Sequence, residues 1–314
     1  MNPATAEPDI ARKVAFLARV EAYPELPRRV EVRETHMSWV FLTDERAYKL
    51  KKPIRRDYLD FSTVESRRLN CHEELRLNRR LAAPVYRSVL PLLLHADGQL
   101  GLSGLGDAVD WLIVMNRLPE RAALDRRLRR GLVGPEEIER ILLTLAPFYR
   151  DAEKAATGEA DYCRRFSDAV AANSDKLLAP RFDLPADQVR RIAAELRNFL
   201  DRRGGLLAAR ANAGKIVEAH GDLRPEHIFL VPEPMIIDCL EFNRGMRLLD
   251  PAEELAYLAM ECSALDADWV GGKLFFHYAR LTGDEPPEQL IRFYRASRAL
   301  LRARLSAEHL ETPA

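Results

Sequence analysis

The sequence predicts an α+β protein of two units, and three observations support this prediction. The chain has 314 residues, which is about twice the usual size of one domain. Residues 29–115 alternate short apolar strands with one helix, whereas the residues after 119 form charged, amphipathic helical patterns. We therefore expect a strand-rich unit over 1–118 and a mostly helical unit over 119–314.

The first unit is predicted to begin with a short helix and to continue as a sheet. Residues 9–20 place Ile10, Val14 and Leu17 on one helical face. Apolar runs with turn residues between them predict strands at 29–34, 38–43, 47–52, 86–94 and 109–115. The pattern Ser62-Thr63-Val64-Glu65 is typical of a capping box, so a helix is expected over 63–81.

The second unit is predicted to be helical with one interruption. Helical periodicity covers 121–130, 135–157, 160–178, 186–203, 252–262, 267–281 and 287–309. Within 216–243, the apolar runs IFLV and MIID flank a proline-rich turn, which is typical of a hairpin.

Composition and charge exclude several classes of protein. Lysine and arginine number 48 against 48 aspartate and glutamate, so the formal net charge is +0. This balance argues against a basic nucleic-acid binder. No apolar run approaches the roughly 18–20 residues of a membrane span, and the start MNPATAEPDIARK lacks a signal-peptide core. We expect a cytoplasmic protein with no membrane partner.

The cysteine and glycine patterns argue against a zinc site, disulfides and a glycine-rich phosphate loop. The four cysteines lie far apart without C-x-x-C spacing, so buried thiols are expected rather than a zinc site or disulfides. Neither G-x-G-x-x-G nor G-x-x-x-x-G-K-[ST] occurs. The glycines of 101–106 have the wrong spacing and are followed by Asp107 and Asp110, which would repel phosphate, so we interpret 101–106 as a hairpin turn.

A series of polar residues follows the order of parts in kinase-type phosphoryl transfer. His220-Gly-Asp222 comes directly before an apolar strand, and Asp238 ends the strand expected to pair with it. Lys49 lies earlier, on a predicted strand, and the capped helix carries Glu73 and Glu74. A strand lysine, a helix carboxylate, an H-x-D triplet and a strand-terminal aspartate in this order favour phosphoryl transfer.

These motifs resemble the aminoglycoside phosphotransferase and choline kinase-like family of the protein-kinase fold. The family patterns H-G-D-L-x-P-x-N, I-I-D and D-P-x-x-D-L-A are similar to residues 220–227, 236–238 and 250–256. The stretches ETHMSWVFL, AYKLKKP, LDFST and DCLEFN resemble an uncharacterised bacterial subgroup that is sometimes fused to a second ATP-binding domain. The resemblance covers about 30 to 310 and implies a two-lobed fold with an antiparallel N-terminal sheet.

The resemblance implies a role for each matching residue. Asp222 corresponds to the catalytic base, which orients the substrate hydroxyl. Asp238 corresponds to the Mg²⁺ ligand that bridges the nucleotide phosphates. Lys49 corresponds to the lysine that holds the α- and β-phosphates of ATP. Its helix partner is expected to be Glu74, with Glu73 as the alternative.

Further candidates surround these residues. His220 and Arg224 share the catalytic loop with Asp222, although His220 also fits a purely structural role as a brace of the loop. The adenine ring is expected to lie against the linker at Met115, Asn116 and Arg117. Phosphate contacts are expected from the turn that contains His36 and Ser38, through side-chain hydroxyls and backbone N–H groups.

Two departures from the family pattern affect the expected activity. His227 stands where the family has a metal-binding asparagine, and an imidazole is a less natural Mg²⁺ ligand than an amide oxygen. Mn²⁺ or a single ion is therefore an alternative to paired Mg²⁺. The turn Thr35-His36-Met37-Ser38 also lacks glycine, so the close approach of a bare backbone to phosphate is lost.

Structural interpretations remain beside the functional ones. The lysines at 49, 51 and 52 also fit a solvated edge strand, and Asp250 also fits the N-cap of a helix that begins at Pro251. The stretch 46–56 has six basic residues and no acid, whereas 218–254 has nine acids against three arginines, a net charge of −6. This contrast predicts ATP held by a basic strand over an acidic floor that suits metal ions and a cationic acceptor.

The leading hypothesis is an ATP-dependent phosphotransferase that acts on a hydroxyl of a small molecule. A nucleotide-binding regulatory pseudokinase and a nucleotidyl transferase on the same fold are the alternatives. The acceptor, the choice between ATP and GTP, and protein partners do not follow from the sequence.

Overall fold

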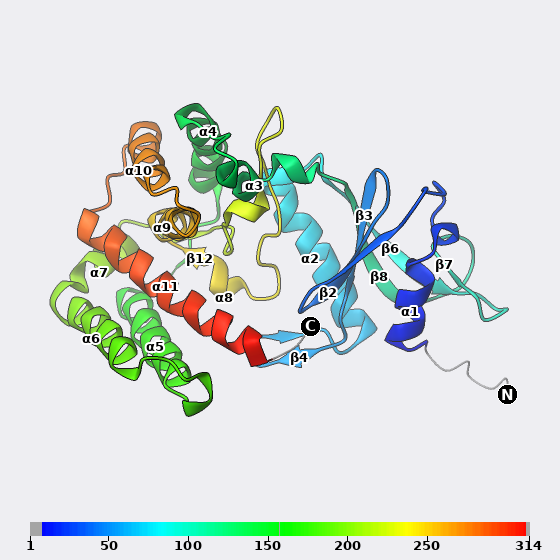
Figure 1. Ribbon diagram of the computed structural model, residues 1–314, viewed down its shortest axis with the longest axis horizontal. Coiled ribbons are helices and arrows are strands. Elements are labelled where there is room, and N and C mark those ends of the chain that lie inside the picture. Colours follow the sequence, from blue (N-terminus) through cyan, green and yellow to red (C-terminus); the bar gives the residue numbers. More distant parts are fainter. Residues whose placement is uncertain (1–7, 157, 312–314) are drawn as a thin grey trace. The chain divides into compact units, whose positions relative to one another are not determined.

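The computed structural model describes residues 8–156 and 158–311 (Figure 1). Expectations about residues 1–7, at the start of the predicted first unit, lie outside the described residues. The chain divides into two compact units. Unit 1 contains the residues up to Pro119 and the segment Met235–Asn243, and unit 2 contains Glu120–Pro234 and the residues from Arg244.

The segment Met235–Asn243 differs from the predicted division, which assigned it to the helical unit. It belongs to unit 1 because Met235 and Ile237 pack against the apolar cluster beneath the main helix of that unit. The backbone N–H of Cys239 also donates to Asn78 Oδ1 at 2.9 Å.

Unit 1 is built on a six-stranded antiparallel sheet with the strand order β1-β2-β3-β8-β6-β7. Its strands are β1 (Glu31–Glu34), β2 (Ser38–Leu42), β3 (Arg46–Lys51), β6 (Tyr86–Leu94), β7 (Leu100–Gly101) and β8 (Asp107–Asn116). A small hairpin of β4 (Arg55–Arg56) and β5 (Leu59–Asp60) follows β3. Because β3 lies between β2 and β8, the interpretation of its lysines as a solvated edge strand is wrong.

Helices cover both faces of this sheet (Figure 1). On one face, α1 (Ile10–Leu17) and the short 3₁₀ helix η1 (Val20–Ala22) pack against Tyr48 and Leu50 of β3. On the other face, α2 (Val64–Ala82) packs over Ala47. Successive strand residues point to opposite faces, so Lys49 and Lys51 share the α2 face with Ala47.

The start of α2 differs from the prediction by one residue. Thr63 is the N-cap, and its hydroxyl accepts a hydrogen bond from the backbone N–H of Ser66 at 3.0 Å. Ser66 completes the capping box by accepting from the N–H of Thr63 at 3.2 Å. Ser62 instead donates its hydroxyl to Asp60 at 2.6 Å, so the predicted box of Ser62 and Glu65 is wrong.

Unit 2 is mostly helical, as predicted. Its helices are η2 (Glu120–Ala122), α3 (Leu124–Arg129), α4 (Pro135–Asp151), α5 (Glu159–Leu177), η3 (Pro180–Phe182), α6 (Ala186–Arg203), α7 (Gly205–Asn212), η4 (Pro225–His227), α8 (Arg244–Arg247), α9 (Pro251–Ser263), α10 (Trp269–Thr282) and α11 (Glu288–Glu311). Short strands β9 (Val217–Glu218), β10 (Ile228–Phe229) and β12 (Leu248–Leu249) also belong to unit 2, whereas β11 (Met235–Ile236) belongs to unit 1. Helix α7 was not predicted, because the glycine pair at 204–205 is typical of a break between elements.

The core of unit 2 lies between α5, α9 and α11 (Figure 1). Asp250 caps α9, since its carboxylate accepts from the backbone N–H of Ala252 at 2.9 Å. The same carboxylate accepts two hydrogen bonds from Arg210, at 2.6 and 2.7 Å. Asp250 therefore has the structural role that the N-cap interpretation assigned to it.

Other acids of 218–254 are also neutralised inside unit 2. Glu218 is 3.0 Å from Arg247, and Glu253 is 2.7 Å from Arg298. The predicted acidic floor is correspondingly reduced, because these carboxylates lie in buried ion pairs.

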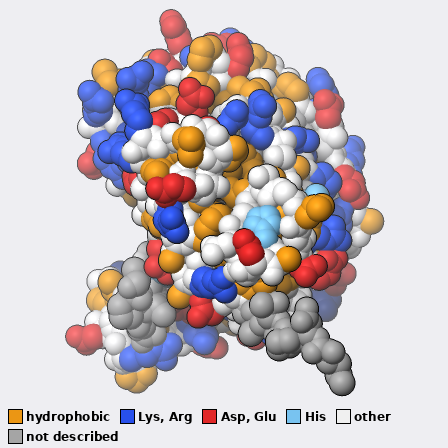
Figure 2. Space-filling view, turned by 90° about the vertical axis from the view of Figure 1, so that its right-hand side faces the viewer, with side chains coloured by type: hydrophobic (Ala, Val, Ile, Leu, Met, Phe, Trp, Pro, Cys, Tyr) orange, Lys and Arg blue, Asp and Glu red, His pale blue; other side chains and the backbone are white. Residues whose placement is uncertain are grey.

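The surface charges are mixed in sign and the cysteines are free thiols, as the composition and the cysteine spacing indicate. Side chains of both charge signs occur over the face drawn in Figure 2. All four cysteines are free thiols, and Cys71, Cys239 and Cys262 are buried whereas Cys163 is half-buried. In the part of the chain that the structure describes, no helix has the length and apolar character needed to cross a membrane.

Candidate active site

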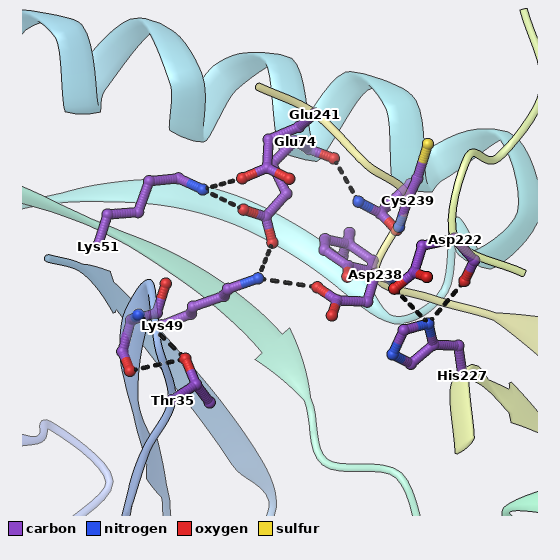
Figure 3. A network of polar contacts seen from close by, with 12 residues as sticks. Thr35, Lys49, Lys51, Glu74, Asp222, His227, Asp238, Cys239 and Glu241 are labelled. Atoms are coloured by element: carbon purple, nitrogen blue, oxygen red, sulfur yellow. Dashed lines mark hydrogen bonds and ion pairs between the residues drawn. The ribbon is translucent and has the colours of Figure 1, made fainter. Parts of the chain in front are cut away.

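Two lysines of β3 and one carboxylate of α2 form the centre of a charged cluster in unit 1 (Figure 3). Lys49 Nζ donates to Glu74 Oε1 at 2.8 Å and to Asp238 Oδ1 at 2.9 Å. Lys51 Nζ donates to Glu74 Oε2 and to Glu241 Oε1, both at 2.5 Å. Of the two helix carboxylates that the sequence left open, Glu74 is the partner of Lys49.

Glu73 lies on the exposed side of the same helix. Its carboxylate is 2.7 Å from Arg76, one turn further along α2. Residues at adjacent helical positions point about 100° apart, so only one of the two glutamates can face the sheet.

Backbone contacts fix the segment that carries Asp238. The N–H of Asp238 donates to the Tyr86 hydroxyl at 3.2 Å, and the next N–H donates to Asn78. Asp238 has a φ of 63°, in the left-handed region that residues other than glycine rarely adopt. Such backbone strain persists only where the surroundings hold it, and it is concentrated at functional sites.

The charges of the cluster are mutually stabilised. Burial alone lowers the pKa of Lys49, but the carboxylates of Asp238 and Glu74 outweigh burial, and the pKa lies well above its usual value. Burial raises the pKa of Glu74, but Lys49 and Lys51 reverse this, and the net pKa is lowered. Lys49 is therefore a cation and Glu74 an anion at neutral pH. Burial raises the pKa of Glu241, which Lys51 offsets only in part.

The turn between β1 and β2 is closed by its own hydroxyl group. Thr35 Oγ1 accepts from the N–H of Ser38 at 3.0 Å and donates to the carbonyl of Ser38 at 2.9 Å. Ser38 is buried, whereas His36 is exposed. Ser38 thus offers little exposed surface, whereas Thr35 and His36 are the exposed residues of the turn, and phosphate contacts from this turn stay a prediction.

The candidate linker residues are anchored within unit 1. Met115 is buried on β8, opposite Ala47 of β3. The Asn116 amide donates to the carbonyl of Pro84 at 2.7 Å, and the Arg117 guanidinium donates to the carbonyl of Thr43 at 2.7 Å. The start of the linker is thus held in place by side-chain hydrogen bonds to backbone carbonyls of unit 1.

The loop that carries Asp222 lies in unit 2 and is held from α9. Glu254 accepts hydrogen bonds from the backbone N–H groups of Gly221 at 2.6 Å and His220 at 3.3 Å. Gly221 has a φ of 89°, which a residue with a side chain would adopt only under strain. The backbone before Asp222 is therefore fixed.

Two histidines brace this loop. The backbone N–H of Asp222 donates to Nδ1 of His220 at 3.3 Å, and His220 is buried. His227 Nδ1 is 2.9 Å from the carbonyl oxygen of Asp222. A carbonyl only accepts, so this nitrogen carries the proton, and a metal would be ligated by the other ring nitrogen of His227.

The Asp222 carboxylate faces three polar groups of unit 2. Tyr257 donates its hydroxyl to Oδ1 at 3.3 Å, and His227 Nδ1 is 3.7 Å from Oδ2. Arg224 is 3.9 Å from Oδ2 and forms an ion pair with Glu226. The Asp222 side chain is 32% exposed, so it is oriented by its neighbours and still accessible.

Two solved structures align with most of this chain and identify its fold. An aminoglycoside phosphotransferase in complex with GDP and kanamycin aligns with a TM-score of 0.50 and 14% identity over 95% of this chain and 90% of that chain. A choline/ethanolamine kinase family protein from Mesorhizobium loti aligns with a TM-score of 0.53 and 16% identity over 96% of this chain and 87% of that chain. The chain has the aminoglycoside phosphotransferase-like fold. The predicted resemblance and the two-unit kinase-like fold are confirmed.

Sequence comparisons connect this chain with longer proteins. Uncharacterised proteins of Mycobacterium tuberculosis and Mycobacterium bovis are 34% identical over 285 residues, which cover 88% of this chain and 54% of the relatives. The chain therefore spans about half the length of the curated relatives it matches. No protein-family model matches the chain.

The resemblance implies a metal ion, and the described side chains offer donors for it without forming a complete site. Among the described residues, no group of three or more His, Cys, Asp or Glu side chains can hold a metal ion by itself. Asp238 offers a carboxylate that is 45% exposed, and His227 offers one ring nitrogen. Mg²⁺ usually binds one or two carboxylates together with substrate phosphates, so the Asp238 carboxylate of unit 1 fits an ion that arrives with a nucleotide.

Several residues of the site were missed by sequence reasoning. Lys51 was assigned only to a basic stretch, and Glu241 only to the motif DCLEFN. Lys49 and Lys51 are two residues apart on a strand, so the strand period places their side chains on the same face of the sheet. Glu254 and Tyr257 lie four and seven residues after Asp250, on the helical period of α9. That spacing is the signal that could have identified them.

Proposed function

We propose that this chain is a small-molecule kinase that transfers the γ-phosphate of ATP to a hydroxyl group of its substrate. The observation that carries the proposal is the cluster of Lys49, Glu74 and Asp238 in a chain whose second unit presents the oriented carboxylate of Asp222. Phosphoryl transfer depends on positioning and on charge stabilisation, and both are built into these residues.

Lys49 is the proposed ligand of the nucleotide phosphates. Its ammonium group is kept charged by Glu74, which remains in place when a phosphate replaces Asp238 as the second partner. Asp238 and His227 are the proposed metal ligands. A bound Mg²⁺ or Mn²⁺ neutralises charge on the nucleotide phosphates. The adenine ring is proposed to lie at the linker that begins with Met115 and Asn116.

Asp222 is the proposed base. Its carboxylate orients the acceptor hydroxyl and takes its proton as the bond to phosphorus forms. Tyr257 and the loop backbone hold the carboxylate, while Glu254 and His220 hold the backbone. His220 is thereby a positioning residue in this proposal, and Arg224 is the proposed contact of the transferred group.

The names of the structural neighbours support a hydroxyl acceptor. One neighbour was solved with kanamycin, one is called a choline/ethanolamine kinase family protein, and a third is a glucosamine kinase with a TM-score of 0.50 over 94% of this chain and 77% of that chain. These four compounds all carry a hydroxyl group and an amine or ammonium group. We extend this to a cationic alcohol as the acceptor class of the present chain.

A regulatory pseudokinase is the second candidate. It is favoured by His227 in place of asparagine and by the glycine-free turn at 35–38. On this alternative the chain binds nucleotide without turnover. Nucleotidyl transfer would instead release pyrophosphate and leave AMP on the product.

The test is a metabolite screen that detects products directly. The chain is incubated with ATP or GTP, with Mg²⁺ or Mn²⁺, and with a mixture of small-molecule alcohols, and masses shifted by one phosphate are sought. The proposal predicts such a product for the natural sequence and its loss in Asp222→Asn. Nucleotide binding without any product supports the pseudokinase.

A further inference from the structure

Lys51 and Glu241 form a second buried ion pair beside Lys49 and Glu74 (Figure 3). The side chains of Lys51 and Glu241 are 1% and 8% exposed, and their charged atoms are 2.5 Å apart. The Lys51 ammonium also lies over the ring of Phe61, 4.9 Å from its centroid.

The two ion pairs connect into one chain of charges. Asp238 contacts Lys49, both lysines contact Glu74, and Lys51 contacts Glu241. The segment after β11 is therefore attached to β3 at two points, three residues apart. Both points meet at Glu74, which is 0% exposed.

The two attachments have different roles when a nucleotide binds. Lys49 is the proposed phosphate ligand, and Asp238 exchanges this lysine for a metal ion. The contact of Lys51 with Glu241 is more buried than that of Lys49 with Asp238. It stays the same when Lys49 binds phosphate and when Asp238 binds a metal ion. Separating the two charges of a buried ion pair is strongly unfavourable, so the contact with Lys51 favours the position of Glu241 and its segment on β3.

We propose that Lys51 and Glu241 form a positioning pair that holds the segment 238–241 on β3 and α2 while Asp238 takes up a metal ion. The proposal deepens the proposed function and rests on it for the role of Asp238. Neither residue touches substrate, so the pair acts only through the position of the Asp238 backbone and carboxylate.

The first experiment measures hydrogen exchange of the amides of Asp238 and Cys239 without nucleotide. These N–H groups donate to Tyr86 and Asn78 and are protected only while the segment stays in place. Glu241→Gln is expected to exchange faster at these amides, and Glu73→Gln on the exposed side of α2 is the matched control. Unchanged protection in a folded Glu241→Gln protein overturns the proposal.

The second experiment compares ADP binding with Mg²⁺ and with EDTA by calorimetry. Removing a residue that orients a metal ligand typically weakens metal affinity by about 10–100-fold. Glu241→Gln is therefore expected to reduce the Mg²⁺-dependent gain in ADP affinity about tenfold, while metal-free ADP affinity stays within about twofold. An unchanged Mg²⁺-dependent gain contradicts the proposal.

A double variant separates positioning from folding. Lys51→Met alone removes the ammonium group that is 2.5 Å from Glu241, whereas Lys51→Met with Glu241→Gln removes both charges and is expected to recover thermal stability. The proposal predicts that the 238–241 amides remain loosened in the double variant. Recovery of their protection shows a purely structural pair and overturns it. If the natural sequence binds no nucleotide, the proposed function fails, and the exchange experiment still decides the role of the pair.

Discussion

The carboxylate of Glu254 accepts a hydrogen bond from the backbone N–H of Gly221 at 2.6 Å, which joins α9 to the loop of Asp222. Its other oxygen accepts from the Tyr149 hydroxyl at 2.8 Å. Burial raises the pKa of Glu254, although these donors partly offset it. The loop is thus positioned by a helix residue far along the chain.

We predict that Glu254→Gln disorders this loop, because an amide NH₂ cannot accept the bonds that one carboxylate oxygen accepts. A buried donor left without a partner costs about 1–3 kcal/mol. Turnover is expected to fall while metal-free ADP affinity is retained, as measured by product formation and calorimetry. Glu261→Gln, on the same helix and paired with Arg302, is the control. Equal turnover in the two variants would show that Glu254 does not position the loop.

Glu73 and Glu74, which are neighbours on α2, give a matched stability experiment. Glu74→Gln removes the carboxylate shared by Lys49 and Lys51 and is expected to lower the free energy of unfolding by about 3–5 kcal/mol. Glu73→Gln removes a surface pair with Arg76 and is expected to change it by less than about 1 kcal/mol. Urea denaturation measures both. Similar losses would contradict the assignment of Glu74 as the central carboxylate.

Asp284 makes the stability of unit 2 depend on pH. Burial raises its pKa, but Arg210 and Tyr278 outweigh burial, and the pKa lies below the usual 3.8. A lowered carboxyl pKa adds stability above the unfolded-state pKa, and this stability is lost as the pH falls through the folded-state value. Asp284→Asn is therefore expected to cost about 1–3 kcal/mol at pH 7 and progressively less below about pH 4.

The measurement for Asp284 is the free energy of unfolding at pH 7, 4 and 3. Asp187→Asn, at a fully exposed side chain, should leave stability nearly unchanged throughout. A difference between Asp284→Asn and the natural sequence that does not shrink at low pH would contradict the sign of this prediction.

His227→Asn tests the departure from the family pattern. An asparagine amide can donate to the Asp222 carbonyl as Nδ1 of His227 does, and its oxygen suits Mg²⁺ better than an imidazole nitrogen. We expect the ratio of ADP affinity in Mg²⁺ to that in Mn²⁺ to increase. Calorimetry in the two metals measures the ratio, and an unchanged ratio means that His227 is not a metal ligand.

Local patterns in the sequence predict most of the fold. The strands of unit 1 and the main helices of unit 2 follow from period-2 and period-3.6 patterns. Adjacent serine and threonine residues are both good N-caps, so the sequence does not show which one begins the helix. Ser62 was predicted as the N-cap of α2, whereas Thr63 has this role. The segment Met235–Asn243 was misplaced because its packing partners lie on α2, far away in the sequence.

Candidate site residues that stand in a sequence motif could be predicted. Residues that join the site only through packing could not. Lys49, Asp222 and Asp238 stand in recognisable motifs. Lys51 and Glu241 are 190 residues apart, and nothing local indicates that they meet. The net charge of 218–254 also overstated the acidic surface at the site, since Glu218 and Glu253 are paired with arginines inside unit 2.

The most direct test of the central claim is Asp222→Asn, measured for both turnover and binding. The account predicts that phosphate transfer from ATP falls by about 10²–10⁴-fold, while the affinity for Mg²⁺ and ADP stays within a few fold. Asp187→Asn, which removes a charge from the exposed surface of unit 2, is the control and should retain transfer. Full transfer activity in Asp222→Asn would contradict the account.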